Sequence, residues 1–138
     1  MLKKASVKRK LTRQELRDLD IEIGFMEGVV HRDPHFVEAL QILGDDYTRR
    51  GRLNAGLKID ERLSRLRPRD PMVLYNLACS YALNKRLEQA VTALSRAIDR
   101  GYHDFRWLMK DPDLENLRKH SLFKKIKAKV RSSRIKVQ

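Results

Sequence analysis

Few side chains in this sequence have the types and spacing that catalysis or metal binding requires. The only thiol, Cys79, stands among aromatic and apolar residues, without a cationic neighbour that would activate it. His31 and His35 are four residues apart, but Asp33-Pro34 interrupts the helix between them, so they need not share a face. No group of Cys, His and acidic residues has the spacing of a metal site. The sequence therefore predicts neither a reactive thiol nor a metal centre.

Asp45 and Asp46 form a carboxylate pair within a predicted helix, but adjacent residues diverge by about 100° around a helix axis. No His or Ser stands beside them, so we interpret the pair as part of a solvated helix face. The six glycines stand singly and form no phosphate-binding loop. The sequence thus predicts no catalytic residue and no cofactor, and we expect a protein that is not an enzyme.

The elements that position these residues are better defined, above all over residues 70–101. Asp70 is suited to cap a helix, and Pro71 fits the first turn, where a missing N–H is not needed. A polar break at residues 84–86 precedes a second helix, which Gly101 ends in a left-handed conformation. Apolar residues recur at helical spacing on both sides of the break: Val73, Leu74, Leu77, Ala78, Tyr81, Leu87, Ala90, Val91, Leu94, Ala97 and Ile98. This pattern predicts two helices folded back on each other.

A second copy of the pattern lies 34 residues upstream. The aligned positions are Leu40 and Leu74, Leu43 and Leu77, Gly44 and Ala78, Tyr47 and Tyr81, Gly56 and Ala90, and Pro34 and Pro68. On these positions the chain resembles the tetratricopeptide-repeat family over residues 35–101. The resemblance implies an all-α fold, a right-handed α–α superhelix, whose function is protein–protein interaction.

The net charge of +13 is concentrated at the two ends of the 138-residue chain. Residues 1–17 hold seven Lys or Arg and one acid, residues 118–138 hold nine and none, and residues 18–117 hold fifteen against seventeen acids. One Cys excludes an internal disulfide, and no apolar run approaches the ~18 residues of a membrane span. No apolar segment follows the basic N-terminus, so we expect no secretory signal peptide and a cytoplasmic protein.

We expect one domain over residues 12–130, between a mobile basic tail at 1–11 and a basic tail at 131–138. Thr12 and Glu15 fit a capping box that begins a leading helix over 12–32. We interpret this helix as a cap on the open end of the solenoid, and the second helix of a half-lost repeat is the alternative. Complete repeats occupy residues 35–67 and 70–101. We expect closing helices over residues 104–130. This segment resembles one often found after bacterial tetratricopeptide repeats. Its large apolar residues are expected to seal the last repeat: Trp107, Leu108, Leu114, Leu117 and Phe123.

The first helix of each repeat lines one curved face of such a solenoid. The side chains expected on this face are Glu38, Gln41, Ile42, Asp45, Thr48, Arg49, Met72, Tyr75, Asn76, Cys79, Ala82 and Leu83. Their mixture of acids, amides and adaptable apolar groups suits an extended peptide with basic and apolar character. The resemblance implies that Asn76 holds the backbone of a ligand, and a satisfied surface amide is the alternative. Gln41 and Asp45 stand where the family's carboxylate clamp needs a lysine and an asparagine, so chaperone C-termini are not expected as ligands.

The basic ends support a second interpretation. Cations that could contact nucleic acid or another anion are Lys3, Lys4, Lys8, Arg9, Lys10, Lys124, Lys125, Lys127, Lys129 and Arg131. Such binding would be independent of nucleotide sequence, because no aromatic residues alternate with the charges in the tails. Two solubilising tails without a dedicated ligand are a further interpretation, and membrane attachment is not expected.

We therefore expect an all-α tetratricopeptide solenoid of about six to seven helices. Its expected function is that of a non-catalytic adaptor or scaffold that binds a peptide or a partner protein on the concave face. The alternative is a nucleic-acid- or ribosome-associated protein that uses its basic arms. Self-association through the open ends of a short solenoid is a third interpretation.

Overall fold

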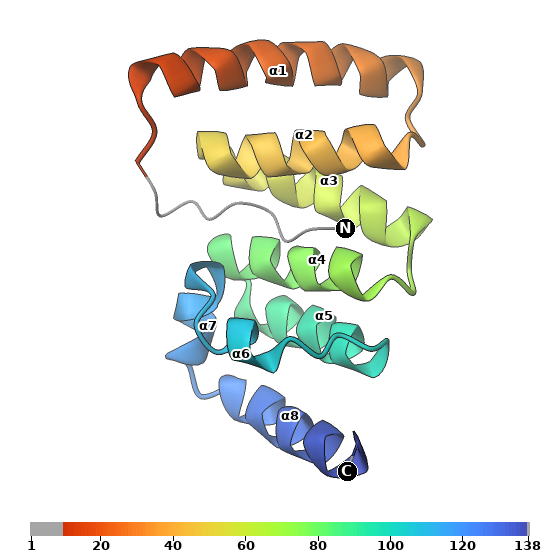
Figure 1. Ribbon diagram of the computed structural model, residues 1–138, viewed down its shortest axis with the longest axis vertical. Coiled ribbons are helices and arrows are strands. Elements are labelled where there is room, and N and C mark those ends of the chain that lie inside the picture. Colours follow the sequence, from red (N-terminus) through yellow and green to blue (C-terminus); the bar gives the residue numbers. More distant parts are fainter. Residues whose placement is uncertain (1–9, 138) are drawn as a thin grey trace.

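The chain folds into eight α-helices and one 3₁₀ helix, with no strand, over residues 10–137, which the computed structural model describes (Figure 1). The elements are α1 (Arg13–Arg32), α2 (Val37–Arg50), α3 (Leu53–Leu66), α4 (Pro71–Leu83), α5 (Leu87–Asp99), α6 (Phe105–Leu108), η1 (Pro112–Leu114), α7 (Glu115–Arg118) and α8 (Phe123–Val137). The long helices lie one below another, from α1 at one end of the molecule to α8 at the other. Consecutive helices from α1 to α5 pack against each other, and α8 packs against α5. The expected all-α fold is confirmed.

α1 begins at the capping box that the sequence predicts. The Thr12 Oγ1 accepts from the Glu15 N–H at 3.1 Å, and the Glu15 Oε1 accepts from the Thr12 N–H at 3.0 Å. The apolar stripe of α1 is buried through Leu19, Ile23, Met26 and Val30. Leu11 belongs to the segment predicted as a mobile tail, yet it is half-buried against the same apolar residues, so the ordered domain begins before Thr12. Residues 1–9 of that predicted tail lie outside the described residues.

The two central hairpins, α2–α3 and α4–α5, place small residues where their helices approach. Gly44 and Gly56 are buried in the first hairpin, as are Ala78 and Ala90 at the aligned positions of the second. A Cβ atom on Gly56 would lie 2.8 Å from Thr48 Oγ1, which is closer than two unbonded atoms tolerate. The spacing between α2 and α3 therefore depends on glycine at position 56.

The same Tyr–Glu hydrogen bond occurs in two helix pairs, once between α1 and α2 and once between α3 and α4. Tyr47 Oη donates to Glu27 Oε2 at 2.5 Å, and Tyr81 Oη donates to Glu61 Oε2 at 2.9 Å. Both the donors and the acceptors are 34 residues apart. The register in which α1 packs on α2 is thus the register in which α3 packs on α4.

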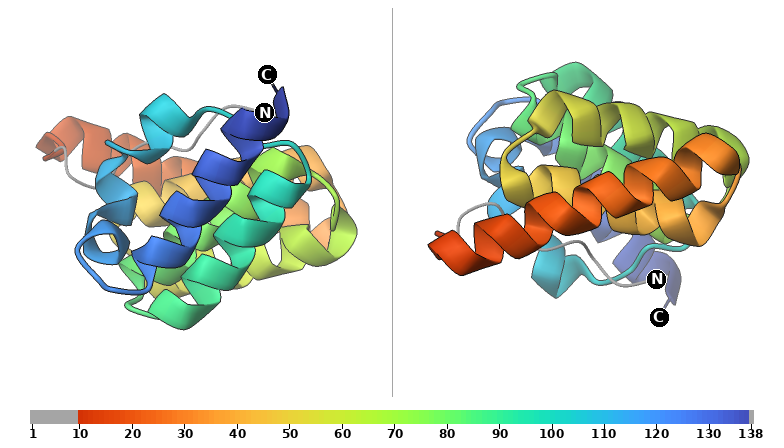
Figure 2. Two further views of the ribbon diagram at one scale, coloured as in Figure 1. Left: turned by 90° about the horizontal axis from the view of Figure 1, so that it is seen from below. Right: turned by 90° about the horizontal axis from the view of Figure 1, so that it is seen from above.

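The segment after α5 departs most from the prediction. Three short elements, α6, η1 and α7, lie beside α4 and α5, and α8 crosses α5 at the end of the molecule (Figure 2). This division of the closing segment raises the number of α-helices above the expected six to seven. The residues predicted as a basic tail from 131 onward continue α8 to Val137. Phe123, Ile126 and Val130 anchor that helix on the core.

The buried apolar residues form two clusters. One joins α1, α2 and α3 with Val73 of α4, and includes Leu19, Leu40 and Leu63. The other joins α4, α5 and the closing segment, with Leu57 as its contribution from α3. Because α3 contributes Leu57 to the second cluster and α4 contributes Val73 to the first, the two halves of the molecule meet between these two helices.

Candidate functional site

Five of the side chains predicted to line the first repeat form an accessible surface on α2. We call this surface the α2 face; its members are Glu38 and Ile42, which are exposed, and Gln41, Asp45 and Arg49, which are half-buried. Ile42 leaves 44% of its surface in solvent and is the apolar member of this surface. Thr48 is the exception among the predicted residues, because it is buried and its Oγ1 donates to the Gly44 carbonyl oxygen at 3.0 Å.

Acidic groups surround one end of the α2 face. Arg49 lines a hollow of about 200 Å³ together with Glu15, Asp18 and Glu22 of α1. Asp46 lies next to Glu22 and is almost completely buried, so it is not part of the solvated face that the sequence predicts. Burial, reinforced by the neighbouring Glu22 carboxyl group, raises the pKa of Asp46 to about 8. The surface here is therefore rich in acidic groups, with Arg49 as a partial counter-charge.

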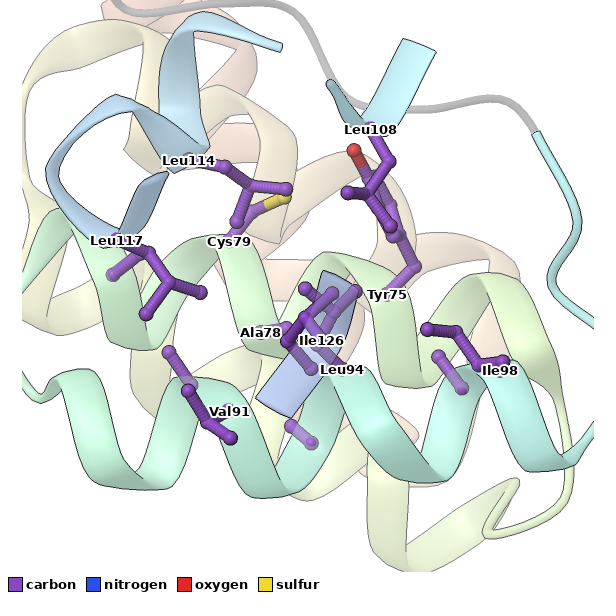
Figure 3. Packing of buried hydrophobic residues seen from close by; sticks show 14 of the residues in the cluster. Tyr75, Ala78, Cys79, Val91, Leu94, Ile98, Leu108, Leu114, Leu117 and Ile126 are labelled. Carbon is purple, nitrogen blue, oxygen red and sulfur yellow. The ribbon is translucent and has the colours of Figure 1, made fainter. Parts of the chain in front are cut away.

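The corresponding surface of the second repeat is not accessible. Tyr75, Asn76, Cys79 and Ala82 of α4 are buried, and only Met72 and Leu83, near its ends, are half-buried. Figure 3 shows the reason: Leu108, Leu114 and Leu117 of the closing segment lie around Tyr75 and Cys79. The chain covers this face of α4 with its own residues. The expectation that Tyr75, Asn76 and Cys79 contact a partner is therefore not supported by where they lie.

Tyr75 makes the most specific contacts within this covered region. Its ring stacks on Tyr102, with centroids 4.1 Å apart and planes 6° from parallel. Its hydroxyl donates to Asp111 Oδ2 at 2.7 Å, and the Cys79 Sγ lies 3.8 Å from the same oxygen. Burial, together with the nearby Cys79 and Asp111, raises the pKa of the Tyr75 hydroxyl well above its usual range. Tyr75 therefore holds the closing segment and remains a neutral hydrogen-bond donor.

Asn76 fits neither role considered from the sequence. Its side chain is buried, so it is not a surface amide, and its Oδ1 has no hydrogen-bond partner among the described residues. The side chain is therefore not accessible to a ligand backbone in this arrangement of the chain.

Sequence reasoning missed three residues that fasten the closing segment. Asp111 caps η1 by accepting from the Asp113 N–H at 3.0 Å, and its other oxygen accepts from the Tyr75 hydroxyl. Arg118 donates to the Leu108 and Asp111 carbonyl oxygens at 3.1 and 2.7 Å. Tyr102 supplies the ring on which Tyr75 stacks. The available signal was compositional: an aromatic- and leucine-rich closing segment needs an apolar surface, and Tyr75, Cys79 and Ala82 provide one.

The predicted anion-binding cations are only partly accessible. Lys10, Lys124, Lys125, Lys127 and Arg131 are exposed, whereas Lys129 pairs with Asp99 at 2.7 Å. Lys3, Lys4, Lys8 and Arg9 lie outside the described residues. Among the described residues, the structure thus gathers a cationic row on α8.

Within residues 10–137, no three His, Cys, Asp or Glu side chains gather as metal ligands would. In the same part of the chain, no helix combines the length and apolar character needed to cross a membrane.

No model of a known protein family matches the chain. A segment of 49 residues, 36% of the chain, is 43% identical to part of a protein from Arabidopsis thaliana whose name describes it as chloroplastic. The match spans only 15% of the length of that protein, so the likeness concerns one segment and not the whole relative.

Proposed function

We propose that this chain is a non-catalytic adaptor of the tetratricopeptide-repeat type, a right-handed superhelix that binds a peptide or partner protein. The observation that carries the proposal is the contact repeated after 34 residues, Tyr47 with Glu27 and Tyr81 with Glu61. The burial of small residues at aligned positions of both hairpins supports the same register. The proposed adaptor catalyses no reaction and uses no cofactor.

The binding surface of the proposed adaptor is the α2 face, since the closing segment covers α4. Glu38 and Asp45 supply negative charge, and Ile42 supplies an exposed apolar contact. The acidic hollow beside Arg49 extends the negative region onto α1. A complementary ligand is an extended segment that carries Lys or Arg next to a large apolar side chain.

A peptide array tests this assignment. Peptides that combine basic and apolar residues should bind the purified chain, and those that replace the basic residues with Glu should not. Charge reversal through Glu38→Lys with Asp45→Lys should weaken the selected peptide about tenfold or more, measured by fluorescence polarisation. Glu88→Lys changes an exposed acid on α5 and is the matched control. An array without binders, or equal binding by the charge-reversed chain, would count against the α2 face.

The cationic row of α8 supports the second candidate, binding of nucleic acid or another polyanion. Phe123, Ile126 and Val130 are buried, so the helix is docked and its lysines face outward at Lys124, Lys125 and Lys127. If about four cations meet phosphates, log K should fall against log salt with a slope of about −3 to −4. Changing the three exposed lysines to Glu should abolish retention of RNA in a filter assay, and Lys119→Glu is the control. Retention that survives this change would exclude α8 as the anion site.

For its location we propose the cytoplasm, as the sequence predicts. The name of the Arabidopsis relative places that protein in the chloroplast, so a plastid is the alternative. Fractionation of the source cell with an antibody against the chain decides between them.

A further inference from the structure

The outward side of α1 carries the most exposed large apolar side chains of the described residues. Ile21 is 72% exposed and Phe25 is 68% exposed. They are four residues apart, so they lie one above the other on one side of the helix, opposite the buried stripe. α1 is the end element of the column in Figure 1, and Figure 2 shows the outward side of α1 uncovered when seen from above. This side of α1 contacts no other described helix.

Gly24 and Gly28 lie on the same side of α1 and are four residues apart, as Ile21 and Phe25 are. A Cβ atom built on Gly24 or Gly28 would meet nothing within 4 Å. No packing inside the described chain therefore requires glycine there, although each costs about 1 kcal/mol relative to alanine in a helix interior. The close approach of a backbone from outside gives these glycines a physical reason. Side chains and depressions thus alternate along this side of the helix.

The two ends of this side carry opposite charges, which would face each other if the surface packed against a second copy of itself. Asp18 precedes Ile21 by about one turn, Arg32 follows Gly28 by about one turn, and both are exposed. A two-fold axis near Gly24 and Phe25 runs the second α1 antiparallel to the first. It sets Ile21 against Gly28 of the second copy and Asp18 against Arg32 of the second copy.

We propose that the protein forms a two-fold homodimer through antiparallel packing of this α1 surface. The surface consists of Asp18, Ile21, Gly24, Phe25, Gly28 and Arg32. The two Phe25 rings meet at the axis, beside the two Gly24 residues that let the backbones approach. One pair of helices buries less area than the ~1,600 Å² of an average stable interface, so the dimer exchanges with monomer. Asp18 also lines the acidic hollow beside Arg49, whereas Ile21, Phe25 and Gly28 belong to neither that hollow nor the α2 face.

Sedimentation velocity of the full chain, from roughly 1 µM to 200 µM, tests the dimer. The sedimentation coefficient should rise from the monomer to the dimer value across this range, and Phe25→Lys should abolish the rise. Met109→Lys alters another exposed apolar side chain, outside the α1 surface, and should leave the rise unchanged. A chain that stays monomeric throughout, or a dimer that survives Phe25→Lys, overturns the proposal.

Gly28→Gln separates the interface from folding. Glutamine forms helices better than glycine, so the thermal midpoint of the dilute monomer should rise by a few degrees. The same side chain fills the depression opposite Ile21, so the dimer should weaken about tenfold or more. A variant that is more stable and still dimerises normally overturns the proposed packing.

A charge exchange tests the antiparallel register. Asp18→Arg alone and Arg32→Asp alone should each weaken the dimer about tenfold, because like charges then face each other. The double variant restores opposite charges and should return the dissociation constant to within about threefold of the original. Failure to restore it excludes this register. The peptide affinity of the α2 face should be unchanged in Phe25→Lys, so failure of the dimer and failure of the proposed function are told apart.

Discussion

Asp111 joins the closing segment to α4 through a single carboxyl group. One oxygen accepts from the Asp113 N–H at 3.0 Å and the other from the Tyr75 hydroxyl at 2.7 Å. All three side chains are buried. Water cannot replace a partner that is lost at such a position, so these hydrogen bonds contribute more to stability than equivalent bonds at the surface.

Two tyrosine hydroxyls allow this difference to be measured. Tyr75→Phe leaves Asp111 Oδ2 without its hydroxyl donor, and the free energy of unfolding should fall by about 1–3 kcal/mol. Tyr81→Phe removes a half-buried bond to Glu61, where water can substitute, and should cost less than about 1 kcal/mol. Urea titration measures both, with an unchanged dependence on urea as the sign that the unfolded state is the same. Equal losses for the two variants would mean that the burial of Tyr75 has no energetic weight.

Asp46 is the residue whose ionisation should make folding depend on pH. Its pKa is raised to about 8 in the folded chain, first by burial and then by Glu22, against about 4 for an unfolded aspartate. Between these values the folded state holds a proton that the unfolded state has released, so stability should fall as pH rises from about 4 to 8. Asp46→Asn removes this titration. The free energy of unfolding that the original chain loses between pH 5 and pH 8 should therefore be smaller in the variant, by about 1–2 kcal/mol.

The control for this prediction is a carboxyl group that does not act on Asp46. Glu88 on α5 is exposed and is not among the charges that raise the pKa of Asp46, so Glu88→Gln should leave the difference between pH 5 and pH 8 nearly unchanged. Urea unfolding at both pH values decides the question. A difference that persists in Asp46→Asn would assign the pH dependence to another group.

At the scale of elements, local signals in the sequence predict most helix boundaries. Thr12 and Glu15 cap α1, and Asp70 caps α4 by accepting from the Met72 and Val73 N–H groups. The path of the closing segment was not predictable in this way, because it depends on contacts distant in sequence, such as Tyr75 with Asp111. The end of α8 was missed for another reason. Its last residues are mostly polar and basic, which resembles a tail, although Lys and Arg also favour helix.

Glycine in the α2–α3 hairpin gives a prediction at the same scale. In Gly56→Ala the new Cβ would lie 2.8 Å from Thr48 Oγ1, which is buried and bonded to the Gly44 carbonyl, so Thr48 cannot move without losing that bond. We expect a loss of about 1–3 kcal/mol, despite the better helix propensity of alanine. Gly28→Ala, in open space on α1, should instead stabilise the dilute monomer by about 0.5–1 kcal/mol. Thermal unfolding of both variants would show opposite shifts, and shifts of the same sign would contradict the close approach of α2 and α3.

At the scale of the whole molecule, the sequence predicts the stacked hairpins but places the candidate site on both of them. The α2 face stays accessible, whereas Tyr75, Asn76 and Cys79 are covered by the chain itself. The division of the core into two clusters that meet between α3 and α4 has a consequence for dynamics. Helices in a linear stack contact only their neighbours, so the two ends can open independently of each other.

The native thiol of Cys79 can be used to measure how often the closing segment opens, and no cysteine has to be introduced. It is the only cysteine in the sequence, and it is buried beneath the closing segment. Asp111→Ala removes the hydrogen bond to Tyr75 and should accelerate the reaction of Cys79 with a thiol reagent about 10–100-fold under native conditions. Leu19→Ala weakens the packing of α1, at the other end, by a comparable amount and should change the rate less than about threefold. If both variants accelerate labelling equally, the molecule opens as one cooperative unit, and the closing segment cannot expose α4 while the α2 face stays folded.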